Sequence, residues 1–144
     1  MITDEYTDYV IVIVELENKE EIDRLPGKLK IVIDKRDIPS REYLIAVLHN
    51  FLDTGYLRES WIRDDIYRFL GFLYRETQIS RIVERVKRIE EPVAIIILEK
   101  GDEGELENYR DRMITLRSSF EGIDDLAVFR LNLEKERGKN LKVQ

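Results

Sequence analysis

The segments that most constrain the fold are two unbroken runs of β-branched and aliphatic residues, YVIVIVELE at 9–17 and VAIIILE at 93–99. A strand with one face in water alternates apolar and polar residues, whereas a continuous apolar run is typical of a strand buried on both faces. The two runs therefore predict buried strands, and we expect the first to be central in its sheet.

Periodicity and turn residues indicate the other elements. KIVID at 30–34 and LAVFRLNL at 126–133 are predicted strands, and helices are predicted over 19–25 and 104–117. Together with a three-helix segment, the order is βαβαααβαβ. This order predicts a mixed α/β domain with a small central sheet of about four strands and a layer of three consecutive helices.

The three consecutive helices lie between the second and third strands of this prediction. Ser40, Ser60 and Thr77 are placed to cap their N-termini. Gly55 is suited to end the first helix, and Pro92 ends the third.

Composition narrows the class of protein. A chain of 144 residues suits one domain, which we place at 1–134, with a polar, flexible tail at 135–144. The absence of cysteine excludes disulfides, Cys-ligated metal centres and thiol catalysis. No apolar run is long enough for a membrane span and no targeting signal opens the chain, so we expect a cytoplasmic protein without membrane contact. Charged residues make up 38% of the chain, an enrichment seen in thermophile proteins.

Charge is unevenly distributed along the chain. The net charge is −6, whereas a stand-alone nucleic-acid binder usually carries a basic excess. Residues 58–88 nevertheless contain eight basic and five acidic side chains, a net of +3 that leaves −9 on the rest of the chain. A basic docking surface here would act locally and with the help of partners.

Few residues are candidates for catalysis. Asp34 and Asp37 follow the second strand, where metal-dependent phosphotransferases and nucleases place a metal ligand, but no second carboxylate pair can be assigned beside them. The single histidine, His49, has no accompanying nucleophile and is expected to pack or cap. We therefore expect no catalytic residue, no metal site and no cofactor, with a metal-dependent enzyme at Asp34 and Asp37 as an alternative.

The segment YRETQISRIVERVKRIEE at 74–91 predicts a helix with two faces. At 100° per residue, one face is formed by Ile79, Ile82, Val83, Val86 and Ile89. The opposite face is formed by Arg81, Arg85 and Arg88. Such a helix is typical of solvated surface, yet a row of arginines also suits phosphates, which Arg binds in bidentate fashion. Arg75 adds a fourth cation near the helix N-terminus, whose free N–H groups favour an anion.

Residues 40–86 resemble the small subunit of the KEOPS complex, the family of the PRPK-binding protein (TPRKB-like), as a divergent archaeal-type member. The matching positions are Ser40, Leu44, Ala46, His49, Gly55, Leu70, Leu73 and Gln78-Ile79-Ser80. The chain departs from the family pattern at Arg68, where the family has Glu, at Arg75, where it has a small residue, and at Thr77, where it has Arg.

The resemblance implies a non-catalytic subunit for tRNA threonylcarbamoyladenosine modification, which binds the kinase-like subunit and helps to recruit the single-stranded 3′ CCA end of tRNA. Gln78 would then bond to a base edge and Ile79 would pack on it. Arg75 and Arg81 would reach the phosphates.

The partner surface is less defined by the sequence. Tyr56 and Trp61 are the candidate contacts for a kinase-like partner. The net acidity and the departures at Arg68 and Thr77 favour an alternative, a protein-interaction module that binds such a partner without RNA.

Overall fold

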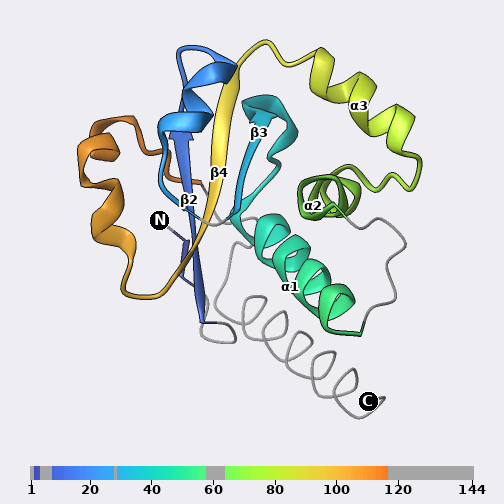
Figure 1. Ribbon diagram of the computed structural model, residues 1–144, viewed down its shortest axis with the longest axis horizontal. Helices are drawn as coiled ribbons and strands as arrows, with labels where there is room; N and C mark the ends of the chain where they lie inside the picture. The colour runs from blue at the N-terminus through green and yellow to red at the C-terminus, as the bar shows by residue number, and fades with distance from the viewer. Residues whose placement is uncertain (1, 4–7, 28, 58–63, 117–144) are drawn as a thin grey trace.

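A four-stranded antiparallel sheet forms the centre of the computed structural model, which describes residues 2–3, 8–27, 29–57 and 64–116, with residues 3 and 53–57 described by their backbone. The strand order is β1-β2-β4-β3 (Figure 1). The strands are β1 (Ile2–Thr3), β2 (Tyr9–Glu15), β3 (Leu29–Asp34) and β4 (Pro92–Glu99).

The two apolar runs are buried strands as predicted, β2 in the central position expected of it and β4 also central. They pair in antiparallel register with Val12 opposite Ile96, and residues 10–14 and 93–98 are all buried. Burial on both faces requires a covering layer on each side of the sheet.

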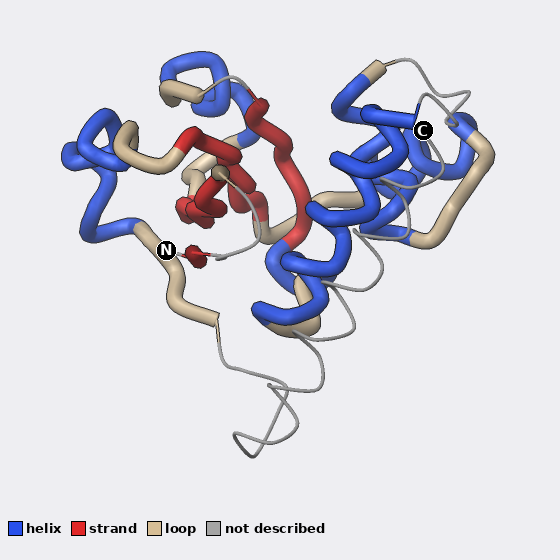
Figure 2. Tube along the Cα trace, turned by 90° about the horizontal axis from the view of Figure 1, so that it is seen from below, coloured by secondary structure: helices blue, strands red, loops and turns tan. Residues whose placement is uncertain are grey.

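Three helices cover one face of the sheet, α1 (Arg41–Leu57), α2 (Asp65–Tyr74) and α3 (Ile79–Lys87). Figures 1 and 2 show them together on one side of the strands. Their shared core contains Ile11, Ile13, Ile31, Ile33, Leu44, Leu48, Phe69, Leu70, Ile82 and Ile95. The predicted class, an α/β domain with a layer of three consecutive helices, is confirmed.

Two 3-10 helices cover the other face, η1 (Lys19–Arg24) and η3 (Glu103–Arg112). Leu106 of η3 is fully buried against the even-numbered side chains of β2 and β4. Arg112 joins the two helices, since its guanidinium donates to both carboxylate oxygens of Glu21 at 3.0 and 2.8 Å. The helix predicted over 104–117 is therefore a 3-10 helix and not an α-helix. It ends at Arg112, and the next residue, Met113, pairs with Val14 in an isolated β-bridge.

The predicted count of about four strands is slightly off, because only three of the described strands are longer than two residues. Three strands are long, and the fourth member of the described sheet is the two-residue β1, which pairs with β2 and is too short for a sequence pattern. The predicted strand over 126–133 and the predicted tail at 135–144 lie outside the described residues.

The helix termini confirm one predicted cap and correct others. The Ser40 hydroxyl accepts the Tyr43 N–H at 3.2 Å, as expected of an N-cap. Helix α2 begins after Asp64, not Ser60, because the Asp64 carboxylate accepts the N–H groups of Ile66 and Tyr67. Helix α1 continues past Gly55 to Leu57.

The turn before β3 requires a glycine. Gly27 has φ +121°, and a Cβ at this position would lie 2.7 Å from Cγ2 of Ile96. The backbone therefore crosses close to the buried face of β4 where only glycine fits.

Across the described ranges, none of the helices combines the length and the apolar character that crossing a bilayer requires.

Candidate nucleic-acid interface

The four residues predicted to contact RNA lie in the junction between α2 and α3 and in the first turn of α3. Arg75 follows the last residue of α2 and has left-handed backbone angles, φ 54° and ψ 47°. Its N–H and that of Glu76 both bond to the carbonyl of Gly71, which closes the helix end. A side chain in this conformation costs about 1 kcal/mol relative to glycine, and such costs cluster at functional positions.

The Arg75 side chain is held in place without losing its charge. Its guanidinium lies over the ring of Tyr43, 5.7 Å from the centroid. The Tyr43 hydroxyl donates to the carbonyl of Leu73, which fixes the ring. Within the described ranges Arg75 forms no ion pair, so its charge remains available to an anion. The sequence carried no signal for Tyr43, because the contact depends on how α1 packs beside the end of α2.

Gln78 and Ile79 lie at the start of α3 and are exposed. Gln78 is the N-cap residue, yet its side chain makes no capping hydrogen bond. Ile79 is 49% exposed and is one of two large exposed apolar residues in the described part of the chain, with Ile66. An open amide beside an open aliphatic surface is a suitable contact for a splayed base.

The predicted helix over 74–91 is too long, since α3 spans only Ile79–Lys87, and the predicted apolar face, which extends to Ile89 beyond α3, is only partly covered. Ile82 is fully buried and Ile89 nearly so, but Val83 and Val86 are half-buried and Ile79 is exposed. Periodicity placed these side chains on one face, but it could not show how much of that face the core covers.

The N-terminus of α3 already carries a carboxylate. Oε1 of Glu76 accepts the N–H groups of Thr77 and Gln78, each at 3.0 Å. These hydrogen bonds, that from Gln78 first, lower the pKa of Glu76. The N-cap is thus Gln78 and not Thr77, and the Gln78 N–H is already occupied by a carboxylate of the protein itself.

Each arginine of the row along α3 has a carboxylate partner within the protein. Arg81 pairs with Glu76 at 3.7 Å, and Arg88 pairs with Glu84 at 3.8 Å. Arg85 pairs with Asp37 at 3.0 Å and lies over the ring of Tyr74, 3.9 Å from the centroid. These contacts match the solvated-surface interpretation of the row, although Arg81 remains 68% exposed.

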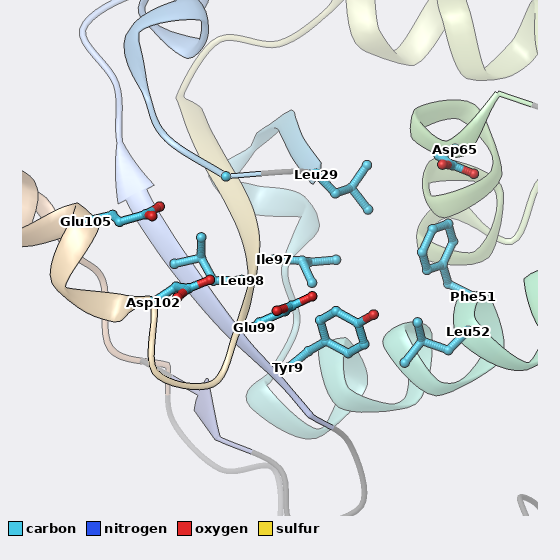
Figure 3. A pocket seen from close by; sticks show the side chains of 11 residues that line it. Tyr9, Leu29, Phe51, Leu52, Asp65, Ile97, Leu98, Glu99, Asp102 and Glu105 are labelled. Carbon is cyan, nitrogen blue, oxygen red and sulfur yellow. The ribbon is translucent and has the colours of Figure 1, made fainter.

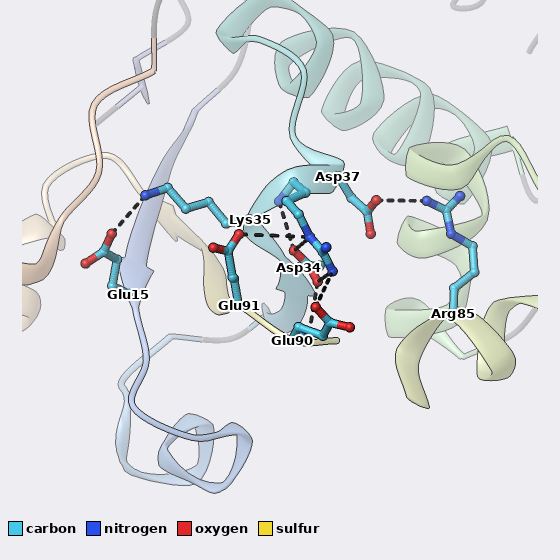
Figure 4. A network of polar contacts seen from close by, with 8 residues as sticks. Glu15, Asp34, Lys35, Asp37, Arg85, Glu90 and Glu91 are labelled. Carbon is cyan, nitrogen blue, oxygen red and sulfur yellow. Dashed lines mark hydrogen bonds and ion pairs between the residues drawn. The ribbon is translucent and has the colours of Figure 1, made fainter. Parts of the chain in front are cut away.

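Asp34 and Asp37 belong to an ion-pair network (Figure 4). The buried Asp34 carboxylate accepts two side-chain hydrogen bonds from Arg36, at 3.0 and 2.8 Å, and one from the N–H of Glu90 at 3.0 Å. The Arg36 guanidinium holds the pKa of Asp34 well below its usual range. Both carboxylates are thus bound by arginine, and the described residues include no cluster of three or more potential metal ligands.

A separate groove of about 350 Å³ lies where β2, β3 and β4 meet α1 (Figure 3). Its apolar wall includes Leu29, Phe51 and Ile97, and its polar groups include the carboxylates of Glu99 and Asp102. Because carboxylates repel phosphate, this groove does not extend the nucleic-acid interface.

The candidate partner contacts cannot be placed at a surface. Tyr56 lies in the last turn of α1, but its side chain is outside the described part of the chain. Trp61 lies wholly outside it.

Neither the protein-family models nor the curated protein sequences compared with this chain give a match. The resemblance to the small KEOPS subunit stays a prediction. Leu44, His49, Leu70 and Leu73, four of its matching positions, are buried core residues of the helix layer. Among the matching positions whose burial is described, only Gln78-Ile79-Ser80 is exposed.

Proposed function

We propose that this chain is a non-catalytic accessory subunit of a KEOPS-like complex, which binds the kinase-like subunit and helps to recruit the 3′ CCA end of tRNA. The proposal rests on the grouping of Arg75, a cation with no ion pair among the described residues, with the open amide of Gln78 and the exposed aliphatic side chain of Ile79. The three residues come from one short junction between packed helices, so the core holds them together.

The chemistry of the grouping suits the end of a single strand. Unstacked bases are bound through their edges and faces, and phosphates are bound by cations. Gln78 supplies donors and an acceptor for a base edge, Ile79 an apolar surface, and Arg75 a phosphate ligand. Arg81 contributes less than Arg75 because Glu76 shares its charge.

The left-handed conformation of Arg75 adds support. Glycine would close the end of α2 at lower cost, so an arginine stands here against local preference. The charge that this arginine presents beside Gln78 gives a functional reason for it. The same reasoning explains the departure from the family pattern, which has a small residue here.

A mobility-shift titration at low salt tests the proposal with tRNA that carries or lacks the CCA end. We expect tighter binding to the complete tRNA, and we expect Gln78→Ala and Arg75→Glu to remove the difference. Arg110→Glu is the matched control, because Arg110 is a 74% exposed arginine on η3, which covers the other face of the sheet. Equal binding of both tRNAs, or wild-type behaviour of the two junction variants, contradicts the proposal.

The second candidate function is a protein-interaction module that binds a kinase-like partner without RNA. The carboxylate partners of the arginine row and the net charge of −6 favour this module. Co-purification of a kinase-like protein, with no tRNA shift at any salt concentration, would select this alternative.

A further inference from the structure

We infer that a single-stranded RNA bound at Gln78 and Ile79 continues along the row Ile79–Val83–Lys87 of α3, with Lys87 as a ligand for a backbone phosphate. This inference rests on the proposed function and extends it from the terminal nucleotides to those that precede them. It places the bound RNA away from Arg81, Arg85 and Arg88, the arginine row that the sequence pattern singled out.

The three residues form a continuous row along the helix. They are four positions apart, so each is displaced by about 40° from the one before, and the row runs up one side of α3. Ile79 and Lys87 are exposed and Val83 is half-buried. The row therefore presents an apolar strip that ends in a cation.

Charge separates this row from the arginine row. Arg81, Arg85 and Arg88 each have a carboxylate within 4.0 Å. Lys87 makes no ion pair or hydrogen bond with any described residue. An unpaired ammonium gives up no internal contact when it binds phosphate, whereas each arginine must share its charge with a carboxylate.

A second cation lies at the same end of the helix. Nζ of Lys19 donates to the carbonyl of Val86 at 3.3 Å, in the last turn of α3. This contact is the usual one between a cation and the C-terminal carbonyls of a helix. It uses one of three ammonium donors, and Lys19 forms no ion pair with another described residue, so a second cation lies at the C-terminal end of α3.

The length of the row sets the length of RNA that it contacts. Eight residues of helix rise by about 12 Å, and a stacked strand rises about 3.4 Å per nucleotide. From Ile79 to Lys87 the row thus spans about three to four nucleotides. Nucleotides held at Gln78 and Ile79 do not reach Lys87, but the preceding ones do.

The test compares Lys87→Gln with Arg88→Gln, two neighbouring neutralisations at the end of α3. Fluorescence anisotropy measures the binding of a CCA trinucleotide and of an RNA octanucleotide that ends in CCA, over a series of salt concentrations. We expect Lys87→Gln to weaken octanucleotide binding about five-fold and to reduce the salt slope by about 0.7. We expect unchanged trinucleotide binding in this variant and unchanged binding of both RNAs in Arg88→Gln.

Each contrary result has a distinct meaning. If Arg88→Gln weakens the octanucleotide and Lys87→Gln does not, the strand follows the arginine row and the inference is wrong. If Lys87→Gln binds the octanucleotide like wild type but captures less kinase-like partner, the row is a protein-binding surface and the inference is again wrong. If wild type binds neither RNA, the proposed function fails and the inference fails with it.

Discussion

The guanidinium of Arg75 lies over the ring of Tyr43 from a left-handed backbone position at the end of α2. Replacement of Arg75 by Gly or by Ala removes the same cation–π contact, but only Gly relieves the backbone. We expect Arg75→Gly to be more stable than Arg75→Ala by about 1 kcal/mol, measured by urea unfolding. Both variants should lose tRNA affinity. Equal stability of the two variants would show that the position is not strained.

We expect Glu76 to limit the affinity of the proposed interface for anions. Its carboxylate lies at the start of α3 and shares the charge of Arg81. Glu76→Gln keeps an oxygen that can accept the Thr77 and Gln78 N–H groups but removes the charge, so we expect tRNA affinity to rise about three-fold at low salt with little change in stability.

The control for this gain is Glu84→Gln, which removes the carboxylate partner of Arg88 on the same helix. If the strand avoids the arginine row, this variant should bind tRNA like wild type. A comparable gain in both variants would mean that the effect comes from net charge alone.

The buried Asp34 carboxylate connects the end of β3 to the segment before β4. We expect Asp34→Asn to reduce the free energy of unfolding by about 2 kcal/mol at neutral pH, because hydrogen bonds from Arg36 to a charged acceptor are lost. Asp37→Asn should cost less than about 1 kcal/mol, since the Asp37–Arg85 pair is partly exposed.

The pH dependence of the Asp34 effect follows from its lowered pKa. The carboxylate contributes its full stabilisation above its ordinary pKa of 3.8, and the contribution is lost as the pH falls towards the lowered pKa of the folded state. The difference between wild type and Asp34→Asn should therefore be constant between about pH 7 and 5 and should narrow below about pH 4. If the stability difference already narrows between about pH 7 and pH 5, the pKa of Asp34 is not lowered as stated.

The turn before β3 depends on Gly27, and Gly104 in η3 serves as the control position for its substitution. Gly27→Ala places a Cβ 2.7 Å from Ile96 at φ +121°, and we expect a loss of about 3 kcal/mol in a urea unfolding experiment. Gly104→Ala meets open space, and its effect should stay within about 0.5 kcal/mol. Similar effects in the two variants would show that the turn rearranges.

The sequence predicted the parts of the fold that depend on burial pattern. The apolar runs identified β2 and β4, and Ser40 was recognised as a cap because its partner lies three residues away. The sequence pattern failed at the start of α2, where two residues of capping type, Ser60 and Asp64, were available and the helix begins after Asp64.

The sequence predicted the positions of the candidate site residues but not the partners of their polar groups. Spacing brought Gln78 and Ile79 to the start of one helix, but it could not show that Glu76 occupies the N–H groups there. It also could not pair Arg85 with Asp37, which comes from a distant part of the chain. The Arg88–Glu84 and Arg81–Glu76 pairs are local in sequence, whereas the Arg85–Asp37 pair depends on the tertiary structure.

The position of β4 between β2 and β3 has a consequence for how the chain folds. During synthesis, β2 and β3 leave the ribosome long before β4, and neither pairs with the other in the native sheet. The sheet forms only after all three helices have been made and their connecting loop has closed, a non-local step that slows folding. Until then two apolar strands have exposed edges, so early folding intermediates of this chain should be prone to aggregation and should depend on chaperones.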